Sequence, residues 1–201
     1  ETTIQEKAKY LNDMQFDKLH YRSKLGTDLT IEMPKNHLWI GGSSMSETGV
    51  RFTANIPTEE IFSAPKRDGV NGIVYATKPL SLSGNLIENF SLRFENGKCV
   101  EVKAEKNQKL LEDLIATDEN ASMLGEVALV QNDSPISNSK RLFYSTLFDE
   151  NASCHLAFGA AYPTCVEGGA AMSEEELLEN GINDSKIHVD FMIGDETTEI
   201  I

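Results

Sequence analysis

The sequence predicts a single domain that mixes helices and strands, of the α+β or mixed-sheet α/β class. Apolar residues recur at helical spacing near the start of the chain and again around residue 110, whereas several short segments alternate as strands do. Between residues 72 and 103 the strand-like segments follow one another without intervening helices. Consecutive strands of this kind favour hairpins over a doubly wound parallel sheet. The 201 residues are enough for one large domain.

The first expected element is an amphipathic helix over residues 3–16. Its apolar positions have helical spacing: Ile4, Ala8, Leu11 and Met14. Because these positions share one face, we expect the helix to cover a core.

Strand candidates follow in the next part of the chain. Residues 29–33 alternate and are stopped by Pro34, and residues 37–40 form a second candidate before the Gly-Gly-Ser-Ser break at 41–44. Alternation resumes over residues 50–54 and ends ahead of Pro57. These patterns predict short strands separated by turns.

The segment from 72 to 103 is predicted to be mainly β. Its clearest part is residues 92–100, where Asn96 and Gly97 lie between two alternating arms. Asn-Gly at such a position is a strong hairpin signal, because both residues tolerate positive φ.

The remaining elements alternate between helix and strand. A helix of about 12 residues is expected from Glu105, because apolar residues from 110 to 115 gather on one side. Residues 126–130 form an apolar run suited to a buried strand, and residues 187–193 alternate as another strand. Between them, Ser173 with a glutamate three residues later is a capping box that opens a short helix.

The net charge of −14 restricts the partners of the chain. A surface of this sign repels phosphate backbones, so nucleic acid is not expected as a partner. The acidity reflects either solubility or a grouping of carboxylates around divalent cations, and composition does not separate the two.

The chain is predicted to be a soluble cytoplasmic protein. No segment has the roughly 20 apolar residues that span a membrane, and no secretory leader is recognisable. Three cysteines, Cys99, Cys154 and Cys165, are too few for a disulfide framework and fit a reducing compartment. The chain begins with Glu1 and ends on Ile201 without a polar tail, from which we expect a piece of a longer polypeptide.

The most specific candidate site is the His188-Val189-Asp190 triplet on the last predicted strand. Residues two apart on a strand point to the same face, so the imidazole and the carboxylate lie side by side. Such a pair suits a metal ion. The alternative is an ordinary edge strand with one polar face.

A second candidate region lies between residues 148 and 162. It contains Glu150, His155 and Tyr162 within fifteen positions. The alternative interpretation is a polar turn followed by a hydrogen-bonded core histidine.

Glutamates provide the third set of candidates. Glu59 and Glu60 follow Pro57 at a strand end, where adjacent glutamates are usually solvated. Glu126 begins the most apolar strand of the chain, and a carboxylate there is costly unless it is paired or binds a metal.

Other kinds of site fit the sequence poorly. The cysteines and histidines lack the short spacings of a structural zinc site, and Cys154 and His155 as neighbours on a strand point apart. No phosphate-binding, dinucleotide-binding or serine-hydrolase motif is present.

Taken together, six sequence blocks resemble the aminopeptidase T, aminopeptidase S and PepS family of bacterial two-metal aminopeptidases. They occur in the order of the family, at similar spacing, through nearly the whole chain: LGTDLTIEMP (25–34), HLWIGG (37–42), NIPTEEIFSAP (55–65), GEVALV (125–130), LFDENASCHLAFG (147–159) and IHVDFMIG (187–194). The resemblance implies that residues 1–201 correspond to the later, metal-binding catalytic domain of the family, and we expect the preceding domain and the final stretch of the family to lie outside this chain.

The resemblance implies a role for each candidate residue. The implied metal ligands are Glu60, Glu126, Glu150, His155, His188 and Asp190, with Glu126 shared between two ions. Tyr162 matches a tyrosine beside the metals that hydrogen-bonds the developing oxyanion, and Glu59 is the candidate general base.

The resemblance further implies two divalent metal ions, a peptide substrate with a free N-terminus and a homodimer of the full-length protein. Zinc or cobalt suits the mixed carboxylate and imidazole set, with manganese or magnesium as alternatives. A water bridging two ions has a lowered pKa and attacks the first peptide bond. Two other functions remain open: a non-catalytic acidic binding or oligomerisation domain, and a metal-dependent hydrolase of another amide bond.

Overall fold

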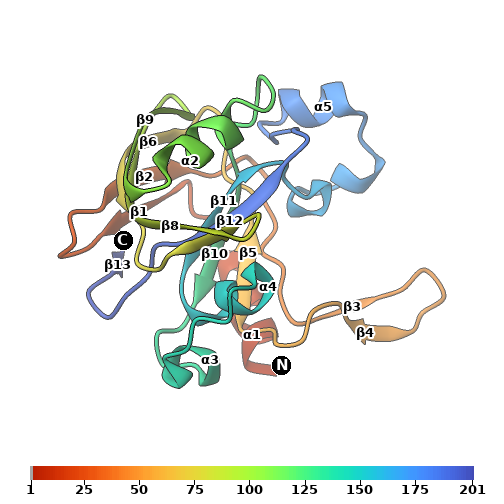
Figure 1. Ribbon diagram of the computed structural model, residues 1–201. Coiled ribbons are helices and arrows are strands. Elements are labelled where there is room, and N and C mark those ends of the chain that lie inside the picture. Colours follow the sequence, from red (N-terminus) through yellow and green to blue (C-terminus); the bar gives the residue numbers. More distant parts are fainter. Residues whose placement is uncertain (1) are drawn as a thin grey trace.

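The computed structural model describes residues 2–201, and Glu1, the first residue of the predicted domain, lies outside this range. Two antiparallel sheets form the body, with helices around them (Figure 1). The strands are β1 Lys18–Arg22, β2 Asp28–Glu32, β3 Ser43–Met45, β4 Arg51–Thr53, β5 Glu60–Ser63, β6 Val70–Tyr75, β7 Leu80–Leu82, β8 Asn85–Glu95, β9 Lys98–Lys106, β10 Leu124–Val130, β11 His155–Gly159, β12 His188–Met192 and β13 Glu199–Ile200. The helices are α1 Thr2–Met14, α2 Gln108–Ile115, α3 Pro135–Ser139, α4 Thr146–Asp149 and α5 Glu174–Glu179, with 3₁₀ turns η1 Glu150–Ala152, η2 Pro163–Cys165 and η3 Gly169–Ala171.

The larger sheet has seven strands and the smaller one has four. The larger sheet runs in the order β13-β1-β2-β6-β8-β7, with β9 also paired to β8, and the smaller sheet runs β12-β11-β10-β5. Each strand pair formed by residues 2–201 is antiparallel. The fold is therefore α+β, the first of the two classes expected from the sequence.

Aromatic side chains from both sheets meet in a shared core. The ring centroids of Phe94 on β8 and Phe158 on β11 lie 5.9 Å apart. Those of Phe90 on β8 and Phe191 on β12 lie 6.0 Å apart. Rings at these separations interact favourably beyond the area that they bury. The core thus occupies one face of the smaller sheet and leaves its other face free for polar side chains.

Most of the expected elements are present. Four strands, β6 to β9, fill the predicted β-rich segment, and β8 and β9 join through Asn96 and Gly97, whose φ values are 49° and 84°. Two consecutive positive φ values are typical of the type I′ hairpin turn. The strands expected over 29–33, 126–130 and 187–193 are confirmed as β2, β10 and β12. The capping box at Ser173 is also confirmed, at the start of α5.

The prediction of a strand at residues 37–40 is wrong. Only single bridges form there, between His37 and Val166 and between Ile40 and Phe62. Since the segment meets a different neighbour at each end, no continuous ladder can form. The predicted break at 41–44 was also wrong in part, because it runs into β3.

Two helices are shorter than expected, and four strands were not predicted: β1, β5, β11 and β13. Helix α1 ends at Met14, whose side chain is 49% exposed and lies off the core-facing stripe. Helix α2 has 8 residues because β9 continues to Lys106 and Asn107 adopts a left-handed conformation between them. Strand β1 alternates between buried and more exposed side chains, with Leu19 and Tyr21 buried.

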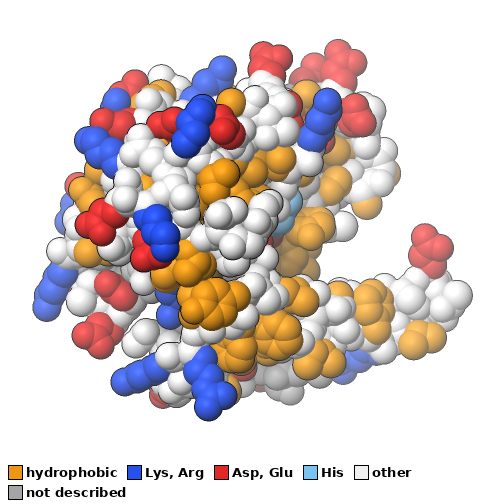
Figure 2. Space-filling model, viewed as in Figure 1, with side chains coloured by type: hydrophobic (Ala, Val, Ile, Leu, Met, Phe, Trp, Pro, Cys, Tyr) orange, Lys and Arg blue, Asp and Glu red, His pale blue; other side chains and the backbone are white. Residues whose placement is uncertain are grey.

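Strands β3 and β4 form an arm that projects from the body (Figure 1). The arm carries exposed apolar side chains, among them Met45, Val50 and Phe52. Figure 2 shows the arm as an extended segment with a hollow between it and the body. Among residues 2–201, no helix combines the length and the apolar character needed to cross a lipid bilayer.

The hairpin between β7 and β8 also turns through two residues with positive φ, Ser83 and Gly84, and so gives a matched test of the turn at Gly97. Gly97 and Gly84 have φ values of 84° and 77°, but a Cβ on Gly97 would collide with the Arg67 carbonyl oxygen, whereas a Cβ on Gly84 would meet nothing within 4 Å. We expect Gly97→Ala to lower the free energy of unfolding by more than Gly84→Ala, which should cost about 1 kcal/mol. Urea unfolding of both variants measures the difference. Equal losses would contradict the proposed collision.

Candidate metal centre

The four strands of the smaller sheet place five ionisable side chains on the face opposite the core. Alternation sends the apolar side chains Ile61, Val127, Leu156 and Phe191 into the core. The residues next to them in sequence point the other way and carry the chemistry: Glu60 on β5, Glu126 on β10, His155 on β11, and His188 and Asp190 on β12. The sheet therefore assembles residues that lie up to 130 positions apart in the chain.

A bulge in β10 places Glu126 on this face. Leu124 pairs with Phe158 and Glu126 with Ala157, so Gly125 is an extra residue between two successive pairs. Without the bulge, Leu124 and Glu126 would share a face, whereas with it Leu124 enters the core and Glu126 faces the site. Only glycine fits at the bulge, because a Cβ would lie 2.3 Å from the Ala160 carbonyl oxygen.

Small side chains leave room between the ionisable groups. Ala157 lies between Glu126 and Asp190 in register, and Ala128 lies beside His155. A larger residue at either alanine would fill the space where the polar groups converge.

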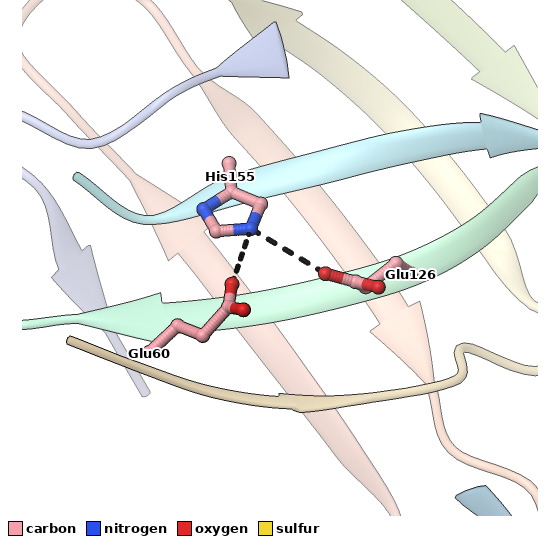
Figure 3. Close-up of side chains that lie close together, drawn as sticks. All are labelled: Glu60, Glu126 and His155. Carbon is pink, nitrogen blue, oxygen red and sulfur yellow. Dashed lines mark ion pairs between the residues drawn. The ribbon is translucent and has the colours of Figure 1, made fainter. Parts of the chain in front are cut away.

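Glu60, Glu126 and His155 form the first of two groups (Figure 3). The Nε2 atom of His155 lies 2.9 Å from Glu60 Oε2 and 3.4 Å from Glu126 Oε1. In Figure 3 both carboxylates point at the same imidazole nitrogen. All three side chains are buried.

Glu126, His188 and Asp190 form the second group. The Nε2 atom of His188 lies 3.5 Å from Glu126 Oε2 and 3.5 Å from Asp190 Oδ1. Glu126 thus turns one carboxylate oxygen toward each group. The arrangement is that of two adjacent three-residue clusters with one shared carboxylate.

Main-chain carbonyls orient both histidines. The Nδ1 atom of His155 lies 3.0 Å from the Ser153 carbonyl oxygen, and that of His188 lies 2.7 Å from the Ala160 carbonyl oxygen. Each Nδ1 therefore carries the hydrogen, and each Nε2 is presented to its carboxylates. Metal-binding histidines are commonly fixed in this way through their second nitrogen.

The ionisable side chains of the site shift one another's pKa values. Burial opposes the charge of His188, but Asp190 and Glu126 outweigh it and raise the pKa of His188 to about 9. For His155, Glu126 and Glu60 likewise outweigh burial and raise its pKa well above the usual value. Burial, with the charges of Asp190 and Glu60, raises the pKa of Glu150 to about 8. In the absence of other cations, protons thus balance the negative charge.

The orphaned atoms of the first group fit a metal ion. Glu60 Oε2 and His155 Nε2 are buried and lack a well-oriented hydrogen bond, although they lie close together. With the hydrogen on Nδ1, the neutral His155 ring presents a lone pair at Nε2. Two lone pairs at this separation repel each other unless a proton or a cation lies between them. Zinc and similar divalent ions accept this set of carboxylate and imidazole donors.

A cavity of about 450 Å³ opens over the two groups. Its wall includes Glu150 and Tyr162, both expected from the sequence, and the base of the arm. The Tyr162 ring lies 5.5 Å from the His188 ring, between centroids. Burial and the charges of Glu126 and Asp190 raise the pKa of Tyr162, so its phenol keeps its proton.

Glu59 lies apart from the other predicted site residues, whereas His155 lies fully buried beneath the carboxylates that line the cavity. Glu59 lines a separate cavity beside α1, because neighbouring residues at the start of β5 point to opposite sides. This position does not suit the general base expected from the sequence.

Sequence reasoning missed two features of the site. Gly125 makes the bulge that aims Glu126, and the only signal was a glycine directly before a glutamate in an apolar strand. Leu147 lines the cavity from α4, although nothing in its spacing distinguished it from a core residue.

Comparisons with known proteins agree with this geometry. A family model described as thermophilic metalloprotease (M29) matches residues 1–201. Aminopeptidase AmpS of Bacillus subtilis (strain 168) is 55% identical over 197 residues, which are 98% of this chain and 48% of AmpS. The structure of wild-type AmpT from Thermus thermophilus matches with a TM-score of 0.92 at 46% identity, covering 98% of this chain and 48% of that one.

A more distant match concerns the fold alone. The structure of 2,5-dihydroxypyridine dioxygenase from Pseudomonas putida KT2440 has a TM-score of 0.68 at 16% identity, covering 98% of this chain and 54% of that one. The chain spans about half the length of the curated relatives that it matches. The family model and the aminopeptidase relatives confirm the resemblance that the six sequence blocks indicated: the chain belongs to the thermophilic metalloprotease (M29) family.

Proposed function

We propose that residues 1–201 are the metal-binding catalytic domain of a metal-dependent aminopeptidase, which hydrolyses the first peptide bond of small peptides. One observation carries the proposal: Glu126 directs its two oxygens to two separate groups of ligand-type side chains. A shared carboxylate of this kind suits two adjacent metal ions. The names of the relatives, aminopeptidases AmpS and T, support the reaction class.

The ligands that we propose are Glu60, Glu126 and His155 for one ion, and Glu126, His188 and Asp190 for the other. Zinc or cobalt suits these donors best, and manganese or magnesium are alternatives. Bound ions would supply an activated water, bridging the two, and a polarised scissile carbonyl. Glu150 lies at the cavity wall outside both groups and provides a further carboxylate to the ligand set.

The remaining side chains of the cavity suit peptide binding. The protonated phenol of Tyr162 can donate a hydrogen bond to the oxyanion that develops on the carbonyl. The carboxylates attract the free α-ammonium group of a peptide, and this attraction favours cleavage at the N-terminus. No similar attraction exists for a blocked terminus.

The compartment and the assembly are further parts of this proposal. The three cysteines are free in the structure, which supports a reducing cytoplasm. A homodimer of the full-length protein is proposed from the family resemblance alone. The proposed partner is a peptide substrate rather than nucleic acid or a membrane, in keeping with the net charge of −14.

Metal content tests the shared carboxylate. After dialysis against zinc and then metal-free buffer, mass spectrometry is expected to find two ions per wild-type chain, and fewer in Glu126→Gln, because both groups lose a charged oxygen. Glu59→Gln is the matched control, since Glu59 neighbours a proposed ligand but lies in another cavity. Equal metal content in wild type and Glu126→Gln would refute the assignment.

Substrate blocking tests the proposed exopeptidase reaction. The native polypeptide that contains this chain should hydrolyse leucine p-nitroanilide and lose this activity on the N-acetylated compound, because acetylation removes the α-ammonium charge. Release of p-nitroaniline measures both rates. Similar rates on the two compounds would favour a hydrolase of another amide bond.

The pH dependence of stability tests the proton balance of the site. In chelator, the free energy of unfolding is expected to fall from about pH 4.5 to about pH 9, because folded Glu150 and His188, with pKa values of about 8 and about 9, hold protons that the unfolded chain releases above the ordinary values of 4.5 and 6.5. Their stabilising contribution is complete below the ordinary pKa values and is lost as pH rises through the raised ones. Urea unfolding at each pH measures the decline.

Saturating zinc provides the control for this titration. Bound ions replace the protons of the ligands, so the decline should disappear. A flat profile in chelator would show that the site holds no such protons.

A further inference from the structure

Asn151 is a fully buried amide that joins two walls of the metal cavity. Its Oδ1 atom accepts a hydrogen bond of 2.7 Å from the backbone N–H of Glu59. Its Nδ2 atom donates one of 3.0 Å to the carbonyl oxygen of Leu147. The side chain is 0% exposed, so water does not compete for either bond. One amide thus ties the start of β5 to the helical segment of α4 and η1.

Both ends of this connection lie next to residues of the site. Glu59 directly precedes Glu60, whose carboxylate approaches His155 in the first group. Asn151 directly follows Glu150, and Leu147 lines the cavity. A shift of the Glu59 backbone would therefore move Glu60 relative to Glu150 and to the rest of the group.

Other contacts around Glu60 do not replace this bond. Glu60 pairs with Val130 at the very end of the β5–β10 ladder, so the chain before it has no ladder partner on that side. The Glu59 N–H is held instead by a side chain 92 residues away. The position of Glu60 thus depends on a contact outside the sheet.

We propose that Asn151 is a positioning residue for the first metal group, acting through the Glu59 backbone to set the place of the Glu60 carboxylate. This inference rests on the proposed metal site and adds a residue that itself touches no ion. It predicts a selective effect: loss of the Asn151 bonds should weaken the ion held by Glu60, Glu126 and His155 and spare the ion held by Glu126, His188 and Asp190.

Cobalt titration of the native polypeptide tests the proposal. In metal-free protein, the visible absorption of bound Co²⁺ reports both the number of ions and their ligand geometry. In Asn151→Ala, we expect one Co²⁺ ion to bind as in wild type and the other about 10- to 100-fold more weakly, the range found when outer contacts of metal ligands are removed.

Asn12 supplies the matched control. Its amide also bonds the backbone at both ends, accepting from the N–H of Trp39 and donating to the carbonyl of Trp39, at 2.7 and 2.9 Å. Trp39 lies outside both ligand groups, so Asn12→Ala should lower stability without changing the cobalt titration. If Asn151→Ala binds both ions as wild type does, while losing stability as Asn12→Ala does, Asn151 is only structural and the proposal is wrong.

Amide hydrogen exchange in the wild-type protein covers the case in which Asn151→Ala does not fold. Coupling is reciprocal, so if the bond to Glu59 positions a ligand, saturating Co²⁺ should slow exchange of the Glu59 amide. The Trp39 amide should be unchanged. Unchanged exchange at Glu59 would overturn the proposal. If the wild type binds no Co²⁺ at all, the proposed metal site is wrong and this inference is wrong with it. If the wild type binds two Co²⁺ ions but exchange at Glu59 does not change, only the role of Asn151 is wrong.

Discussion

The burial of several carboxylates on one sheet face is the constraint on which the rest of the structure depends. Glu60, Glu126, Glu150 and Asp190 are between 5% and 8% exposed and lie around the same cavity. Water cannot screen their mutual repulsion there, and an unpaired buried carboxylate is costly. Only protons or cations can offset the charge. The raised pKa values of His155, His188 and Glu150 are the form that this compensation takes when no metal is bound.

The fold meets this constraint by dividing the smaller sheet into an apolar and a polar face. Aromatic packing against the larger sheet stabilises one face, so the other can carry groups that destabilise the chain. The division requires strict alternation, and β10 keeps it only through the bulge at Gly125. Stability and function are therefore placed back to back on the same four strands.

The sequence was informative where a pattern is local. The alternation of His188 and Asp190 and the position of Glu126 in an apolar run singled out side chains that the structure brings together on one sheet face. The sequence was uninformative where the position of a residue depends on contacts with distant parts of the chain. Residues 37–40 look like a strand but lack a partner to form a ladder. Glu59 was expected beside the ligands, but it lines a different cavity from Glu60. Asn151 carried no signal, because its partners lie in other segments.

The contacts that hold the ligands come largely from the main chain. The Ser153 and Ala160 carbonyls orient the two histidines. The side chain of Asn151 accepts a hydrogen bond from the backbone N–H of Glu59. These contacts fix the two imidazole rings and the start of β5 through the backbone. Because the ligands depend on main-chain contacts, the site is sensitive to any substitution that shifts the backbone. A Cβ on Gly125 would press on the Ala160 carbonyl, so one glycine controls both the direction of Glu126 and the orientation of His188.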